Sequence, residues 1–181
     1  AIDDSDDAWN DTMVHPDSTH WLFEGNGLKF PGLMVRAGVT DRTDVAIYAT
    51  KAIGANYGFV GAQVQRSLAT GAATPWAAAA RASVVTMYGP EDLGFAVYGV
   101  DLLASRTVAL SRWASVSPYA GVSGYLATAH ERTDAVDLDD ERVPGAQGMV
   151  GAELRLSRAR LAAEYNVAKV RSVSLKMGIA M

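Results

Sequence analysis

Hydrophobic and polar residues alternate one by one along most of this chain, from about residue 18 to the C-terminus. The last ten residues show the pattern without interruption, with Val173, Leu175, Met177, Ile179 and Met181 in alternate positions. Because successive side chains of a β-strand point to opposite faces, one face of this segment is continuously apolar. No segment has the period of an amphipathic helix, so the pattern predicts an all-β protein.

The alternating segments predict an antiparallel up-and-down β-barrel of about ten strands, with eight strands as the alternative count. Turn sequences separate the segments, and Gly25-Asn26-Gly27 is a strong hairpin signal. Residues 1–17 are acidic without a sustained period, so we expect an N-terminal segment followed by one barrel domain over residues 18–181. The expected strands span about residues 18–24, 28–40, 44–51, 60–68, 76–88, 93–105, 114–129, 150–157, 161–167 and 172–181.

The face opposite the apolar one carries charged and amide side chains, many of them near the middle of a strand. Alternation alone does not tell which face is inside, and a soluble barrel would expose this polar face to water. A barrel in lipid requires the reverse, an apolar outside and a polar lumen. In that arrangement the expected lumen-lining residues are Arg36, Asp44, Gln63, Gln65, Arg81, Asp101, Glu153, Arg155, Glu164 and Lys176.

Two features of these faces favour the membrane arrangement. The apolar face is rich in Val, Ala and Leu, and Trp21, Phe23, Tyr98 and Tyr165 fall near expected strand ends, as in an aromatic girdle. The polar face has few lysines and balances its positive and negative charges, which suits a narrow interior where charges pair. Arg66 interrupts the apolar face near the end of its strand, where a long side chain can reach an interface.

Composition and charge narrow the classes of function. The chain has 181 residues, no cysteine and a net charge of −4. The absence of cysteine excludes disulfides, Cys-ligated zinc and thiol catalysis, and the acidic balance disfavours nonspecific nucleic-acid binding. No run approaches the roughly 18 consecutive apolar residues of a membrane helix, so any membrane span must be made of strands.

Several segments resemble known sequences. The alternation from Val173 to Met181 is similar to the C-terminal assembly signal of bacterial outer membrane β-barrels, which usually ends in Phe or Trp rather than Met. The stretches Pro118-Tyr119-Ala120-Gly121-Val122 and Gly38-Val39-Thr40-Asp41-Arg42 resemble segments of small barrels of the outer membrane protein A type. The resemblance covers about residues 28–181 and implies an architecture rather than a specific function.

The resemblance also implies a location and partners. It implies a protein of the Gram-negative outer membrane whose signal peptide has been removed, in contact with outer membrane lipid or lipopolysaccharide and with the barrel assembly machinery. With ten strands, the acidic loop at residues 130–145 is expected to be extracellular and both termini periplasmic. Protein partners are not indicated, and no cofactor is expected.

The sequence contains few candidates for a catalytic, phosphate-binding or cation-binding site. Ser117 or Ser123 with His130 and Asp134 could be imagined as a hydrolytic triad, but no spacing supports it. Gly145-Ala146-Gln147-Gly148 precedes a strand rather than a helix and so lacks the context of a phosphate loop. Clustered carboxylates can bind a divalent cation, although a solvated acidic loop is the simpler interpretation. The cation candidates are Asp137, Asp139, Asp140 and Glu141.

These observations favour a non-catalytic outer membrane β-barrel with a polar, largely plugged lumen and a structural, adhesion or minor channel role. Ten strands enclose a space only slightly wider than the eight-strand case, in which side chains fill the interior. The first alternative is a soluble β-barrel that binds an apolar ligand inside. The second is an outer membrane hydrolase, such as a lipase or protease.

Overall fold

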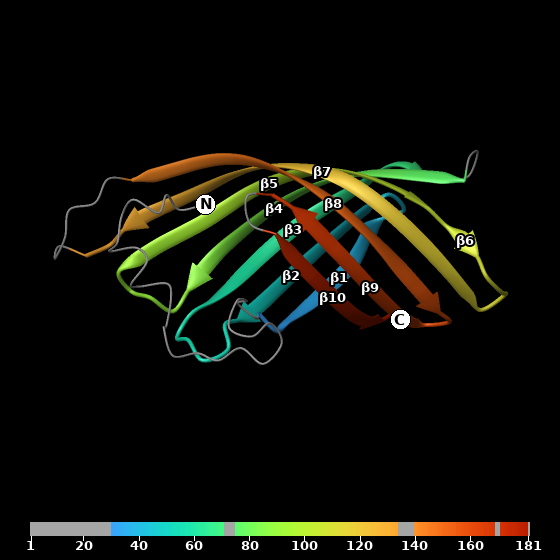
Figure 1. The fold of residues 1–181 in the computed structure, drawn as a ribbon, viewed down its shortest axis with the longest axis horizontal. Helices are drawn as coiled ribbons and strands as arrows, with labels where there is room; N and C mark the ends of the chain where they lie inside the picture. Colours follow the sequence, from blue (N-terminus) through green and yellow to red (C-terminus); the bar gives the residue numbers. More distant parts are fainter. Residues whose placement is uncertain (1–29, 71–74, 134–139, 169–170, 181) are drawn as a thin grey trace.

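The computed structural model describes residues 30–70, 75–133, 140–168 and 171–180. These residues form a single strongly curved antiparallel sheet, which gives the molecule the shape of a half-barrel (Figure 1). The strands are β1 (Gly32–Thr40), β2 (Thr43–Lys51), β3 (Gly58–Thr70), β4 (Trp76–Tyr88), β5 (Leu93–Arg106), β6 (Val108–Ala109), β7 (Ala114–Glu131), β8 (Glu141–Leu156), β9 (Ala159–Val167) and β10 (Ser172–Ile179).

The all-β class and the up-and-down connectivity are confirmed. The strands follow one another across the sheet in the order β1-β2-β3-β4-β5-β7-β8-β9-β10, and the short β6 pairs with β7. Nine of the ten expected strands correspond to long strands of the structure, and the expected strand at 18–24 lies outside the described residues. Among the described residues, none forms a helix with the length and apolar character required for a transmembrane span.

Two connections differ from the expectation. Seven of the sixteen residues expected as a loop at 130–145 lie in strands instead, because β7 continues to Glu131 and β8 already begins at Glu141. Backbone pairing from Ala129 opposite Glu141 onward extends this hairpin through polar residues, whose composition suggested a loop. Between β5 and β7, the stretch expected as a plain connection forms β6.

The sheet has two open edges. Only one strand pairs with β1 and only one with β10, and these two strands end the order of the sheet. Because β1 and β10 are the first and the last of nine long strands that alternate in direction, they run in the same direction. The first described residues, before β1, and the last ones, after β10, therefore lie at opposite ends of the strands.

The apolar set faces outward on every long strand. We call the convex side of the sheet the outer face and the concave side the inner face. The outer face exposes large hydrophobic side chains, to 82% at Leu175 and 86% at Met177 on the open edge. Buried polar side chains such as Asp101 and Ser123 occupy the alternate strand positions, whose side chains point to the inner face. We say that such positions have inner-face parity and that the positions of the exposed apolar residues have outer-face parity. Representative exposed residues from the nine strands are Leu33, Ile47, Val64, Val84, Val100, Val122, Val150, Leu161 and Leu175.

The inner face is shaped by tyrosines that lie over glycines on the neighbouring strand. Tyr48 is directly opposite Gly61, and Tyr125 is directly opposite Gly145. A Cβ atom added to either glycine would meet the tyrosine ring at less than 3.0 Å. The glycine leaves room for the ring to lie across the neighbouring strand, a cross-strand arrangement in which an aromatic residue covers a glycine.

We expect Gly145→Ala to destabilise the fold by about 1–3 kcal/mol, because the added methyl group forces the Tyr125 ring from its place. Gly124→Ala is the matched control, since a Cβ at Gly124 meets no atom within 4 Å. Urea unfolding of the two variants measures the difference. Equal unfolding free energies for the two variants would show that the ring does not depend on the glycine.

Candidate functional site on the inner face

A continuous row of polar side chains crosses the middle of the inner face. The pairing register places each member directly opposite the next, from β2 to β8. Directly opposed side chains have Cβ atoms about 4.5–5.5 Å apart, so neighbours in this row are within interaction distance. We call this set the inner row; it consists of Asp44, Gln65, Arg81, Asp101, Ser123 and Gln147.

The centre of the inner row is a buried ion pair. Arg81 Nε donates a hydrogen bond to Asp101 Oδ2 at 2.5 Å. The Asp101 side chain is 5% exposed and that of Arg81 is 19% exposed, so the pair is largely removed from water. Loss of one partner from a fully buried pair costs about 3–5 kcal/mol, which makes this contact a strong constraint on the interior even after allowance for the partial exposure of Arg81.

A second polar cluster surrounds Glu164 on β9. Tyr119 on β7 reaches across Gly151 on β8 and donates its hydroxyl hydrogen to Glu164 Oε2 at 3.0 Å. Asn166 Nδ2 donates to Glu164 Oε1 at 3.3 Å, and Lys176 Nζ on β10 donates to the same oxygen at 3.5 Å. The cluster thus links β7, β9 and β10, with the Tyr119 side chain crossing β8.

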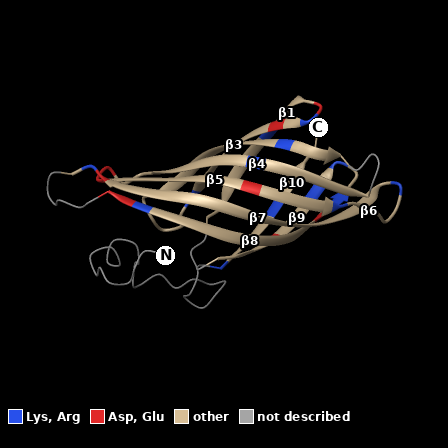
Figure 2. Ribbon diagram, turned by 90° about the horizontal axis from the view of Figure 1, so that it is seen from above, with Lys and Arg blue, Asp and Glu red and all other residues tan. Residues whose placement is uncertain are grey.

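All ten residues expected to line the lumen have inner-face parity, but they do not form one fully paired network. Arg81 pairs with Asp101 and Lys176 with Glu164, whereas Glu153 pairs with Arg160, which the sequence analysis did not include. Gln63 lies beside the inner row. Within the described ranges, Arg36, Asp44 and Arg155 form no ion pair. Figure 2 shows charged positions distributed along the curved strands rather than gathered at a single site.

Aromatic rings gather at the end of the half-barrel where β3 and β5 begin. Phe59 contacts Phe30 with ring centroids 5.4 Å apart, and Phe95 with centroids 6.2 Å apart. Tyr57 also contacts both Phe30 and Phe59. Phe59 and Phe95 have inner-face parity, so this cluster places apolar groups at one end of the inner face.

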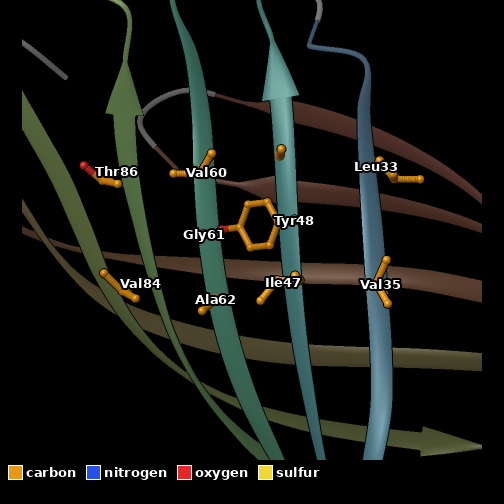
Figure 3. A pocket seen from close by; sticks show the side chains of 10 residues that line it. Leu33, Val35, Ile47, Tyr48, Val60, Gly61, Ala62, Val84 and Thr86 are labelled. Carbon is orange, nitrogen blue, oxygen red and sulfur yellow. The ribbon is translucent and has the colours of Figure 1, made fainter.

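A hollow of about 510 Å³ lies on the outer side of β1–β4. Figure 3 shows aliphatic side chains around it, including Leu33, Val35, Ile47 and Val84, and shows the Tyr48 ring against Gly61. Small residues at its centre create the depression between larger aliphatic ones. A lining of this kind suits a hydrocarbon chain and provides no set of catalytic groups.

The structure does not bring the imagined hydrolytic residues together. Ser123 is buried with inner-face parity, whereas His130 has outer-face parity seven residues farther along β7, or about 23 Å at roughly 3.3 Å per residue. Ser117 is farther still from His130, and Asp134 lies outside the described residues. His130 Nδ1 instead contacts Asp140 Oδ1 at 2.5 Å in an exposed position.

The cation candidates receive no support from the described residues. Asp137 and Asp139 lie outside them, Asp140 contacts His130, and Glu141 is the first residue of β8. In the part of the chain that the structure describes, no group of three or more His, Asp or Glu side chains could hold a metal ion.

The aromatic residues at the strand ends of the outer face differ in part from those expected for an aromatic girdle. Tyr98 was expected near a strand end, but β5 extends on both sides of it and pairs it with Val84 and Leu126 in mid-strand. Trp76 and Tyr88 instead occupy the two ends of β4. Tyr165 is near the end of β9, and Trp21 and Phe23 lie outside the described residues.

Comparisons with protein-family models, with curated proteins and with solved structures find no match for this chain. The functional interpretation therefore depends on the two faces of the sheet and on its open edges.

Proposed function

We propose that this chain forms a bacterial outer membrane β-barrel with a polar, largely plugged lumen and a structural, adhesion or minor channel role without catalysis. The observation that carries the proposal is the outer face, where every long strand exposes large hydrophobic side chains. Soluble monomers rarely expose contiguous apolar patches larger than a few hundred Å². A lipid environment accounts for an apolar face that extends over the whole sheet.

The soluble alternative requires the opposite arrangement of faces. A barrel that holds an apolar ligand needs an apolar interior, whereas the middle of this inner face carries the Arg81–Asp101 pair and the Glu164 cluster. The outer face would then remain in water with its aliphatic side chains exposed. The orientation of the faces therefore favours the membrane proposal over the soluble alternative.

We propose that residues 18–24 form a tenth long strand, which would close this sheet into a barrel. In hydrocarbon every backbone polar group must be paired, so neither β1 nor β10 could remain an open edge there. One strand that precedes β1 through a hairpin at Gly25-Asn26-Gly27 would run antiparallel to β1. Because β10 is parallel to β1, the same strand would also be antiparallel to β10 and give the even strand number of bacterial barrels.

A plugged lumen is favoured by what fills the inner face. The tyrosines lie flat over glycines, the inner row crosses the middle of the sheet, and the aromatic cluster narrows one mouth. Barrels of about eight strands have interiors just wide enough for side chains.

In the proposed orientation, the β7–β8 hairpin end is extracellular and the end of β10 is periplasmic. The proposed partners are outer membrane lipid or lipopolysaccharide and the barrel assembly machinery.

The purified chain is expected to remain monodisperse only in detergent or lipid, because the outer face needs apolar contact. Size-exclusion chromatography of refolded protein, with and without detergent, measures this dependence. Circular dichroism serves as the control that both samples are folded in strands. A folded, monodisperse chain in plain buffer would contradict the membrane proposal.

The lumen is expected to carry no large stable current in planar bilayers. Arg81→Ala combined with Asp101→Ala shortens both members of the central pair together and is expected to raise the conductance severalfold. Val100→Ala, on the outer face beside Asp101, is the matched control and should leave the conductance unchanged. Large currents from the unmodified protein would contradict the plugged lumen.

A further inference from the structure

The carboxylates on the strands are confined to the inner face, whereas basic residues occur on both faces. The strand carboxylates in the described residues all have inner-face parity; they are Asp44, Asp101, Glu131, Glu141, Glu153 and Glu164. The charged strand residues with outer-face parity are all basic. We call these the outer basic set; it consists of Lys51, Arg66, Arg106 and Arg142.

Each member of the outer basic set borders the apolar surface near the end of a hairpin. Lys51 is the last residue of β2, Arg106 is the last residue of β5, and Arg142 is the second residue of β8. Arg66 is opposite Thr43, the first residue of β2. All four are exposed, and in the described chain none of them forms an ion pair.

Two of these basic side chains stand over outward-facing aromatic rings, one at each end of the sheet. Lys51 Nζ lies 6.0 Å from the centre of the Tyr88 ring, and Arg106 Cζ lies 5.8 Å from the centre of the Trp76 ring. Aromatic residues and long basic residues both favour the boundary between hydrocarbon and headgroups, where the basic group extends toward the polar layer. The pairs therefore mark two levels, one at each end of the sheet, where basic and aromatic side chains border the apolar surface.

The spacing of these levels suits a lipid bilayer. Thr43 and Lys51 are eight residues apart on β2, and Trp76 and Tyr88 are twelve residues apart on β4. At about 3.4 Å per residue these spans are about 27 and 41 Å along the strand. A strand tilt of about 40° reduces them to about 21 and 31 Å across the membrane, which brackets the roughly 25 Å apolar band of outer membrane barrels.

We propose that the outer basic set binds the phosphate groups of anionic phospholipids at both edges of the apolar band, so that the protein selects anionic over zwitterionic lipid. This inference rests on the proposed membrane location. The partner must be apolar in its middle and anionic at both edges, which describes a bilayer that contains phosphatidylglycerol. An acidic protein would complement the basic side chains but would leave the aliphatic surface between them without an apolar contact.

The test measures lipid selection at the surface of the reconstituted protein. Full-length chain is inserted into phosphatidylcholine bilayers with trace spin-labelled phosphatidylglycerol or phosphatidylcholine, and electron paramagnetic resonance gives the relative association of the two probes. The unmodified protein is expected to prefer phosphatidylglycerol. In Arg66→Gln/Arg106→Gln, we expect the relative association of the phosphatidylglycerol probe to fall. The expected loss is about fivefold for a lipid beside either altered residue, which is the effect of one basic residue near an anionic surface.

The matched control removes the same number of positive charges from the inner face instead of the outer face. Arg36→Gln/Arg155→Gln removes two exposed arginines of inner-face parity that form no ion pair in the described chain, and should keep the preference. Arg66→Lys/Arg106→Lys keeps both charges and should keep it as well. An unchanged preference in the outer glutamine variant, or an equal loss in the inner one, would overturn the inference. Failure of the unmodified protein to insert would instead overturn the barrel itself.

Discussion

Backbone pairing at the two edges of the sheet is the constraint on which this architecture depends. Each long strand from β2 to β9 has a neighbouring strand on both sides, whereas β1 and β10 each have one side without a strand. In water such edges attract other chains, and in hydrocarbon each unpaired group costs several kcal/mol. The second situation applies under the proposed membrane location, so that location requires the proposed closure of the sheet.

The two faces of the sheet have different chemical roles. The outer face supplies aliphatic contact and ends in basic and aromatic residues at both levels. The inner face holds the charges that must pair, with Arg81 and Asp101 at its centre and Glu164 connecting β7, β9 and β10. Cross-strand tyrosines over glycines shape the same face. For the proposed closed barrel, these paired groups are the reason why we expect little conductance through the lumen.

Much of the fold could be predicted from the sequence because the period of two is a direct consequence of strand geometry. Segments such as Val173 to Ile179 identified both the strand and the face that its apolar residues share. The ends of hairpins were less predictable: Glu141 and Arg142 are polar, yet backbone pairing carries β8 through them. Composition suggests a loop there, whereas the register of a neighbouring strand decides the structure.

The details of the inner face could be predicted only in part. Inner-face parity followed from alternation, but pairing depends on which residues the register places side by side. The contact of Arg160 with Glu153, seven residues away along a hairpin, and the reach of Tyr119 across Gly151 depend on that register. A tyrosine on one strand and a glycine on the next is a usable signal once the hairpin register is known.

Disulfide cross-linking across the proposed seam tests the central claim most directly, because the chain contains no cysteine of its own. Cysteine at Leu22 would be paired in turn with cysteines scanned along the inner-face positions of β1, beginning with Met34, and of β10, beginning with Ser174. The closed barrel predicts intramolecular disulfides from residue 22 to both strands in the lipid-inserted protein. Direct disulfides between β1 and β10, or disulfides formed only between separate molecules, would contradict it.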